Sequence, residues 1–236
     1  MTSSPRILIA GSSYVADEGR RELTKLWYRL VKHINPGIDL VLVDSASPFN
    51  PGVFLPEEVE IEYFSDNIGA ISQGQRDGAG RAFCRCLQLG VEGEYDYVVP
   101  WETDMLWLPP IEPIVDKMHR SDVGVAAAFA NPYQFPEWAC SFWSTKYVKE
   151  SRFIERYDWE HSPKWPIPEW RIANLVDSDL WILPIHGWRN HENQMNIANI
   201  AQLFPYKPCS FLTQCRDFSL YYRFLDINQI SLMEAA

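Results

Sequence analysis

Short apolar runs recur along the first 130 residues of the chain. They are brief and rich in aliphatic residues, and most are closed by Gly, Ser or Asp, which predicts buried strands. These runs occupy residues 6–10, 38–43, 95–100 and 123–129, and residues 59–64 alternate between apolar and polar like a further strand.

Apolar residues at helical spacing separate the runs. Leu23, Leu26, Leu30 and Ile34 mark one face of a helix that Asn35-Pro36-Gly37 ends. Further helices are expected over residues 79–87 and 111–118. The alternation of strand and helix predicts an α/β fold, in which helices flank both faces of a mainly parallel central sheet.

The pattern changes after residue 130. Proline and aromatic residues crowd residues 131–138 and 159–170, and we expect loops there. Between and beyond them the sequence predicts short helices at residues 146–157 and 171–175, a strand at 176–183, a polar loop at 184–194 and an amphipathic tail at 218–225. We expect these elements to cover one end of the sheet within a single domain spanning residues 1–236.

Composition narrows the function. The chain of 236 residues carries a net charge of −10, which argues against a nucleic-acid partner because phosphate binding depends on surplus cations. No apolar run reaches the roughly 18 residues of a membrane span, so no transmembrane segment is expected. Five cysteines without metal-ligand or disulfide spacing indicate reduced thiols and a cytoplasmic location. Nine of the ten tryptophans lie between Trp101 and Trp188.

Polar residues follow several predicted strands at their carboxyl ends, where open parallel sheets bind ligands. They include Gly11-Ser12-Ser13-Tyr14, Asp44 and Glu102-Thr103-Asp104. The chain has neither the glycine pattern of a dinucleotide site nor a Walker A motif. Glu102 and Asp104 could instead hold Mg²⁺ or Mn²⁺, which favour oxygen ligands, or they could be ordinary polar residues at a strand end.

The order and spacing of these features over residues 6–130 resemble the GT-A fold (Rossmann-like) glycosyltransferases, in particular the family-2 type. Asp44-Ser45-Ala46-Ser47 resembles the signature that holds the base or ribose. Asn67-Ile68-Gly69 and Arg76-Asp77-Gly78 resemble the next two motifs, with Asp77 in place of Asn. Glu102-Thr103-Asp104 stands where the family has its Asp-x-Asp metal motif, with Glu as the first acid.

The resemblance implies a metal-dependent and inverting transferase that moves a hexose or deoxyhexose from a nucleotide diphosphate sugar to a glycan or glycoconjugate acceptor. Residues 1–130 would form the nucleotide-sugar half and residues 131–236 the acceptor half. It implies that the donor is bound by Gly11, Ser12, Ser13, Tyr14, Asp44, Ser45, Arg76, Asp77, Trp101, Glu102, Thr103 and Arg189.

The same resemblance implies a Mn²⁺ or Mg²⁺ site and a catalytic base. Asp104 is the expected metal ligand, with Glu102 and His186, and His191 is the second histidine to consider. Glu169 is the expected base, because it opens a helix after an aromatic loop. The other candidates for the base are Glu137, Asp177 and Asp179.

Two other functions remain open on the sequence. A sugar-phosphate nucleotidyltransferase would use a similar sheet, although the loop after the first strand lacks the basic residues usual there. A non-catalytic carbohydrate-binding protein would need only the tryptophans, which could equally serve core packing. Two or three of the following are expected to line an acceptor groove: Trp138, Trp143, Trp159, Trp165, Trp170 and Trp188.

Overall fold

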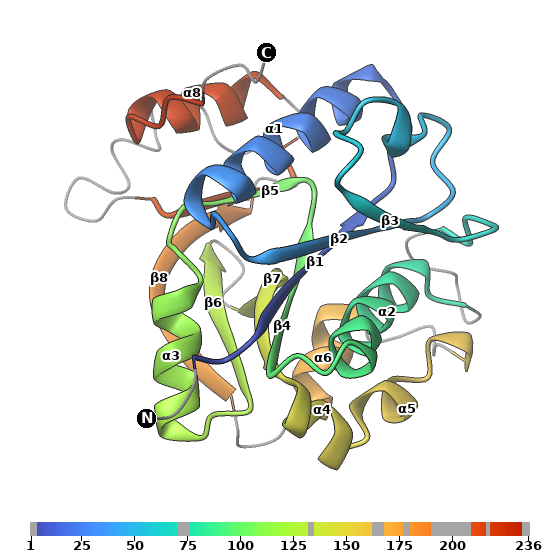
Figure 1. The fold of residues 1–236 in the computed structure, drawn as a ribbon, viewed down its shortest axis with the longest axis vertical. Helices are drawn as coiled ribbons and strands as arrows, with labels where there is room; N and C mark the ends of the chain where they lie inside the picture. The colour runs from blue at the N-terminus through green and yellow to red at the C-terminus, as the bar shows by residue number, and fades with distance from the viewer. Residues whose placement is uncertain are drawn as a thin grey trace.

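The protein is an α/β domain built on one nine-stranded sheet (Figure 1). The structure is a computed structural model, and it describes residues 4–69, 76–131, 135–161, 168–176, 180–189, 209–215 and 218–232. The strands are β1 (Ile7–Ser13), β2 (Asp39–Asp44), β3 (Glu60–Tyr63), β4 (Tyr97–Glu102), β5 (Met105–Trp107), β6 (Val125–Asn131), β7 (Phe135–Ser144), β8 (Leu180–Arg189) and β9 (Phe211–Thr213).

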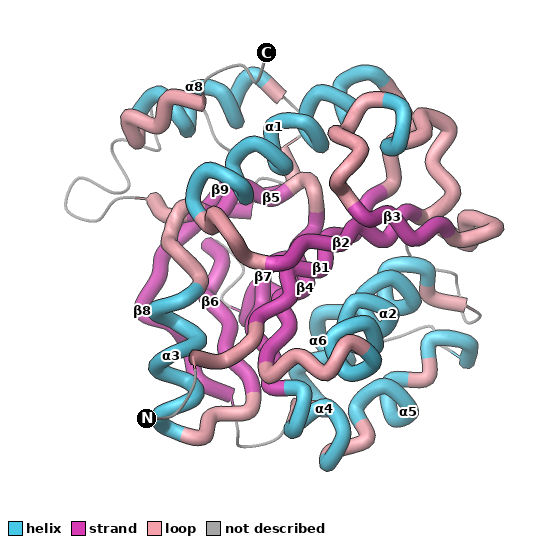
Figure 2. The backbone as a smooth tube through the Cα atoms, in the orientation of Figure 1, coloured by secondary structure: helices cyan, strands magenta, loops and turns pink. Residues whose placement is uncertain are grey.

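The strand order is β3-β2-β1-β4-β7-β6-β8-β9-β5. Strands β1 to β4 pair in parallel, as do β6, β8 and β9, whereas β7 runs antiparallel between β4 and β6. Strand β5 closes the far edge antiparallel to β9. The predicted mainly parallel α/β fold is therefore confirmed. The antiparallel strand β7 lies between β4 and β6, inside the sheet (Figure 2).

Helices cover both faces of the sheet. They are α1 (Glu18–Ile34), α2 (Gly78–Glu92), α3 (Glu112–Ser121), α4 (Thr145–Glu150), α5 (Phe153–Tyr157), α6 (Pro168–Leu175) and α8 (Ser219–Ile227). Apolar residues of α1 and α3 pack on one face, and those of α2, α4, α5 and α6 pack on the other. Helix α8 packs against the outer side of α1 and against β5 and β9. No helix in the described ranges has the length and apolar character of a membrane span.

Helix α1 shows why this packing is tight. Asp17 caps it by accepting a hydrogen bond from the backbone N–H of Arg20 at 2.9 Å. Trp27, on the buried face of the helix, packs directly against Gly11 of β1. A Cβ at position 11 would lie 2.5 Å from the Trp27 ring, so only glycine lets the helix approach the strand this closely.

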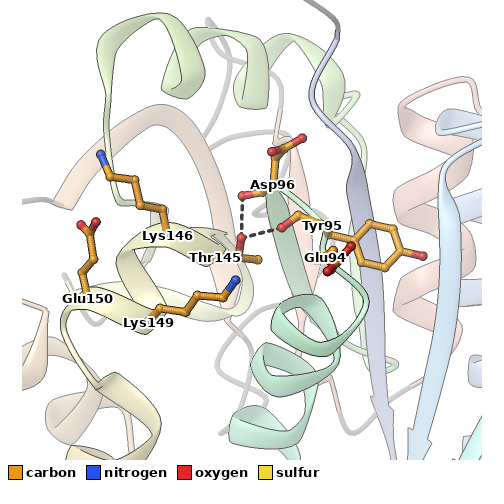
Figure 3. Close-up of a pocket in the computed structure, with 7 residues that line it drawn as sticks. All are labelled: Glu94, Tyr95, Asp96, Thr145, Lys146, Lys149 and Glu150. Atoms are coloured by element: carbon orange, nitrogen blue, oxygen red, sulfur yellow. Dashed lines mark hydrogen bonds between the residues drawn. The ribbon is translucent and has the colours of Figure 1, made fainter.

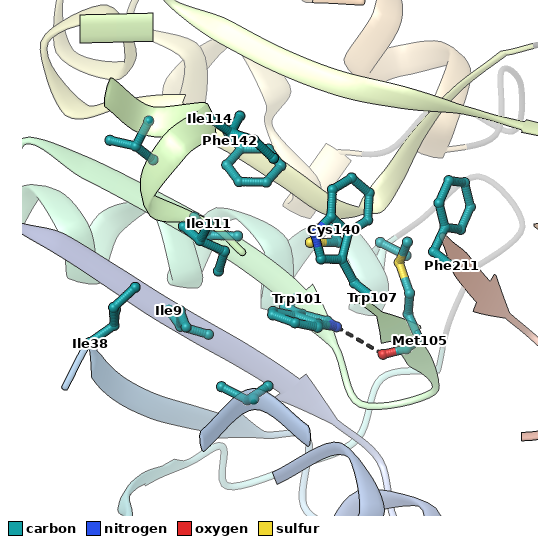
Figure 4. Packing of buried hydrophobic residues seen from close by; sticks show 14 of the residues in the cluster. Ile9, Ile38, Trp101, Met105, Trp107, Ile111, Ile114, Cys140, Phe142 and Phe211 are labelled. Atoms are coloured by element: carbon teal, nitrogen blue, oxygen red, sulfur yellow. Dashed lines mark hydrogen bonds between the residues drawn. The ribbon is translucent and has the colours of Figure 1, made fainter. Parts of the chain in front are cut away.

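Several tryptophans lie in the hydrophobic core between the sheet and its helices (Figure 4). Trp101 is fully buried, meets Trp27 edge-on with ring centroids 6.3 Å apart, and donates its indole N–H to the Met105 carbonyl at 2.8 Å. Trp107 stacks on Phe211 at 5.5 Å. Trp143, also fully buried, contacts the ring of Phe153 at 4.7 Å. All five cysteines of the chain are buried and form no disulfide.

The later elements differ from the sequence expectations. Strand β7 begins within the expected loop at residues 131–138, and β8 continues to Arg189 through the segment expected to be a loop. Pro184 fits in β8 because the pairing with β6 is irregular there and the proline is exposed. The helix expected over residues 146–157 is broken at Arg152, whose φ is +51°.

Candidate active site

Two carboxylates lie at the carboxyl end of the central strand β4. Glu102 is its last residue, and Asp104 lies in the turn that leads to β5. The turn is held on both sides. The Thr103 N–H donates to the Ser12 carbonyl at 3.0 Å, and the Tyr221 hydroxyl donates to the Asp104 carbonyl at 2.6 Å. Strands β1 and β4 and helix α8 therefore fix the position of this pair.

The environment of the pair disfavours negative charge. Burial is the largest cause that raises the pKa of Glu102 to about 8, and the neighbouring Asp104 raises it further. Burial also raises the pKa of Asp104, although Arg20 and Arg189 lower it. The Oδ1 atom of Asp104 is buried and accepts no hydrogen bond from the described residues. A buried oxygen of this kind calls for a partner, and a hard cation could be that partner.

Arg189, the last residue of β8, connects this pair to two further carboxylates. Its Nε and Nη2 atoms donate to Oε2 and Oε1 of Glu137 at 3.0 and 3.1 Å, and its Nη1 donates to Oε1 of Glu169 at 2.7 Å. Glu137 is fully buried. Arg189, Glu137 and Glu169 each act on the pKa of Glu102, which places all of these charges in one site.

The structure thus brings together four of the residues predicted from the sequence: Glu102, Asp104, Glu169 and Arg189. The predicted phosphate contact of Arg189 must compete with its three hydrogen bonds to carboxylates. Within the described residues there is no cluster of three or more acidic, histidine or cysteine side chains arranged to hold a metal ion.

The loop after β1 and the end of β2 lie side by side. The Asp44 side chain is 1% exposed and accepts hydrogen bonds from the Ser13 hydroxyl at 2.9 Å and from the Ser47 N–H at 2.9 Å. Asp44 therefore ties the two loops together, and a donor contact through its carboxylate would require these bonds to open. Tyr14, at 40% exposure, and the partly exposed Ser45 offer surface for a ligand.

The two predicted donor residues just before α2 also differ in exposure. Arg76 is exposed, whereas Asp77 is 1% exposed. Asp77 caps α2 by accepting from the Gly80 N–H at 2.9 Å, and it accepts the Tyr157 hydroxyl at 2.7 Å. Arg171 of α6 lies 3.5 Å from the same carboxylate. Asp77 thus links α2, α5 and α6 inside the fold.

Two of the predicted donor residues, Trp101 and Gly11, are covered by other side chains in this structure. Trp101 is enclosed in the core, so its indole cannot reach a donor. Strand alternation puts His186 on the opposite face of β8 from Arg189. Gly11 is covered by Trp27. The candidates His191, Asp177, Asp179 and Trp165 lie outside the described residues.

The tryptophans divide between the core and the site. Trp138 and Trp143 are buried, whereas Trp159 and Trp188 are partly exposed. The Trp138 indole N–H donates to the backbone carbonyl of Glu169 at 3.0 Å. Trp170, next to Glu169 in the first turn of α6, is 50% exposed.

The sequence interpretation missed how Glu137 is used, because it treated this residue only as a possible base. A signal for its role exists in the sequence. The tripeptide Pro-Glu-Trp occurs at residues 136–138 and again at residues 168–170, and both of its glutamates bind Arg189. Nothing in the sequence pattern marks Arg20 or Tyr221 as neighbours of Asp104.

A hollow lies at the amino end of β4, away from the carboxylates (Figure 3). It has a volume of about 410 Å³ and is lined by residues just before β4 and by α4. Its lysines and acids have mixed charge, and Thr145 donates to the backbone carbonyls of Tyr95 and Asp96. This hollow lies at the amino end of the strand, whereas Glu102 lies at the carboxyl end.

No protein-family model matches the chain. No curated protein sequence matches it significantly either. Solved structures do resemble it. A glycosyltransferase involved in glycosylation of the major capsid of PBCV-1 superposes with a TM-score of 0.57 at 11% identity, covering 94% of this chain and 100% of the other.

Two further glycosyltransferases share the arrangement. The bifunctional enzyme WbbM gives a TM-score of 0.57 at 12% identity over 99% of this chain and 53% of its own. Staphylococcus aureus TarS, solved with UDP, gives 0.52 at 12% identity over 78% of this chain and 60% of its own. At these identities the comparisons show the fold, which is the GT-A-like fold of glycosyltransferases.

Proposed function

We propose that this protein, with its GT-A-like fold, is a metal-dependent glycosyltransferase that moves a sugar from a nucleotide diphosphate donor to a glycan or glycoconjugate acceptor with inversion. One observation carries the proposal. Glu102, Asp104 and Glu169 belong to one charged site at the carboxyl end of β4, where a fold of this type binds its ligand.

The carboxylate pair suits a divalent cation that shares its ligands with a substrate. Asp104 supplies a buried oxygen without a hydrogen-bond donor among the described residues, and Glu102 lies beside it. Mg²⁺ is commonly held by one or two carboxylates together with substrate phosphates. When bound, the cation would offset the charge that develops on the leaving diphosphate.

The exposed residues around the first two strand ends suit the donor. Tyr14, Ser45 and Arg76 are accessible, and each lies just after a strand or just before a helix on that side of the sheet. We propose that they contact the nucleoside and the diphosphate. The buried carboxylates of Asp44 and Asp77 would then act indirectly, by holding these loops in place.

Glu169 would act as the base. It would take the proton from an acceptor hydroxyl while the hydroxyl oxygen attacks the anomeric carbon of the donor sugar. The bond from that carbon to the diphosphate breaks, and the nucleoside diphosphate leaves with the bonding electrons. A single displacement of this kind inverts the anomeric centre. The exposed indole of Trp170 beside Glu169 would offer an apolar face to the acceptor sugar.

A thermal-shift experiment tests the donor and metal parts of the proposal. The protein would be melted with UDP, GDP or TDP, each with Mn²⁺ or with EDTA. UDP is the first probe because a protein of this fold was solved with it. We expect one of these nucleotides to raise the melting temperature only in Mn²⁺. If none does so, the proposed function fails.

Variants locate the effect. Asp104→Asn should abolish the Mn²⁺-dependent shift, whereas Asp122→Asn should keep it, because Asp122 is exposed and follows α3 at the end of the sheet away from Glu102. An unchanged shift in Asp104→Asn would remove this residue from the metal site.

Release of nucleoside diphosphate from the matching sugar nucleotide in the presence of glycan acceptors then tests transfer itself. Release of pyrophosphate from a nucleoside triphosphate would instead indicate a nucleotidyltransferase.

A further inference from the structure

Strand β7 carries an unusual irregularity beside the site. Ala127 of β6 pairs with Ser141, but its neighbour Ala128 pairs with Glu137, so residues 138–140 have no partner on β6. Bulges of this kind bend a strand and redirect its side chains, and they are common next to active sites. Here the bulge starts immediately after Glu137.

Two consecutive residues at this bulge hold Glu169 from two sides. Trp138 donates its indole N–H to the Glu169 backbone carbonyl at 3.0 Å. Glu137 binds the two guanidinium nitrogens of Arg189 at 3.0 and 3.1 Å, which directs the third nitrogen to the Glu169 carboxylate at 2.7 Å. The main chain and the side chain of Glu169 therefore both depend on β7.

Glu137 itself cannot be reached by an acceptor. It is fully buried, and its Oε1 also accepts the Ala139 N–H at 3.0 Å. Burying an ion pair costs several kcal/mol of desolvation, and apolar residues of similar volume often stabilise a fold equally well. The Glu137–Arg189 pair therefore contributes little that the fold alone would need.

We infer that Glu137 is a positioning residue: it fixes Arg189, and Arg189 fixes Oε1 of Glu169 so that Oε2 receives the proton of the acceptor hydroxyl. This inference rests on the proposed function for the role of Glu169, whereas the hydrogen-bonded chain itself does not. Glu137 would thus act in the way that the buried carboxylate of a hydrolytic triad orients the histidine base.

Paired replacement separates positioning from folding. In Glu137→Met/Arg189→Met both charges are removed together, so neither remains buried alone. We expect its melting temperature to stay within a few degrees of wild type and its nucleotide-dependent shift in Mn²⁺ to be retained. Turnover of the sugar nucleotide and acceptor found for the wild type should fall at least about 100-fold in kcat, with little change in the donor KM. A kcat within about threefold of wild type would overturn the inference.

Single variants and a matched control complete the kinetic test. Glu137→Gln and Glu169→Gln should each reduce kcat, and the double variant should be no slower than Glu169→Gln, because the residues act as one unit. Glu62→Gln is the control. Glu62 also binds an arginine through two hydrogen bonds, to Arg85 at 2.6 and 2.7 Å, but it lies on the edge strand β3. It should retain wild-type kcat.

A spectroscopic measurement keeps the inference testable if no transfer is found. The Nε–H signal of Arg189, assigned by its loss in Arg189→Lys, should exchange slowly with water in the wild type. It should remain slow in Glu169→Gln and become fast in Glu137→Gln, because Glu137 binds Nε. Fast exchange in the wild type would refute the anchoring of Arg189 whatever the reaction. Slow exchange without any turnover would instead count against the proposed function.

Discussion

The raised pKa of Glu102 predicts that the metal-free protein loses stability between about pH 5 and pH 8, and that Glu102→Gln removes much of this loss. The ordinary pKa of a glutamate is 4.5, and burial is the main reason why the pKa of Glu102 rises to about 8 in the folded protein. The folded state thus holds the proton more tightly than the unfolded chain. The resulting stabilisation is complete below pH 4.5 and is lost as the pH rises through 8.

The size of the effect follows from the shift. From 4.5 to about 8 is about 3.5 pKa units, and at 1.36 kcal/mol per unit the upper limit is about 5 kcal/mol. Because the side chain is partly exposed, solvent screens its charge, and we expect about 2 kcal/mol. For a chain of this length, that corresponds to a change of about 4–8 °C in melting temperature.

The assay is thermal unfolding in EDTA at pH 5.0, 6.5 and 8.0. Wild type and Glu102→Gln should melt alike at pH 5.0, and the variant should melt several degrees higher at pH 8.0. Glu57→Gln, at an exposed glutamate, should follow the wild type at every pH. Added Mn²⁺ should restore stability at pH 8.0 to the wild type more than to Glu102→Gln. Parallel pH profiles for wild type and Glu102→Gln would refute the assignment of a buried proton to this pair.

Three further substitutions test other parts of the structure. Asp77→Ala should lower the free energy of unfolding by about 3 kcal/mol, because it removes a helix cap and leaves Arg171 buried without this carboxylate; a loss under 1 kcal/mol in urea titration would contradict the buried link. Gly11→Ala should cost about 1–3 kcal/mol, because its Cβ would lie 2.5 Å from the buried Trp27 ring, and an unchanged urea midpoint would show that the ring can shift. Trp170→Ala should leave the urea midpoint within about 0.5 kcal/mol of wild type but raise the acceptor KM, and an unchanged KM would exclude Trp170 from the acceptor site.

Strands β1, β2, β4 and β6 could be predicted because each contains a mostly apolar run, and β3 could be predicted because its residues alternate between polar and apolar. Glu102 and Asp104 were placed at a strand end, whereas Glu169, 65 positions beyond Asp104 in the chain, was placed with them only by the family resemblance. The strand predictions were correct because they used local periodicity together with one rule of topology.

The elements that were missed depend on tertiary pairing. Strand β7 contains Pro136 and a bulge, so its sequence lacks regular alternation, and only its neighbours β4 and β6 make it a strand. Composition does not show which tryptophans are buried and which are exposed, since large aromatic residues serve both cores and binding sites. The contact of Glu137 with Arg189 joins residues 52 positions apart, and the repeated Pro-Glu-Trp tripeptide does not identify Arg189 as the partner.

The position of β7 between β4 and β6 has a consequence for biosynthesis. Strands β4 and β6 leave the ribosome before β7, yet they do not pair with each other. Until residue 144 has emerged, each has an edge that lacks this partner, and exposed edges of this kind invite association with other chains. Residues 1–130 therefore cannot complete the sheet on their own. A nascent chain stalled near residue 130 should therefore need protection by chaperones. A chain that extends past β7 should not need it.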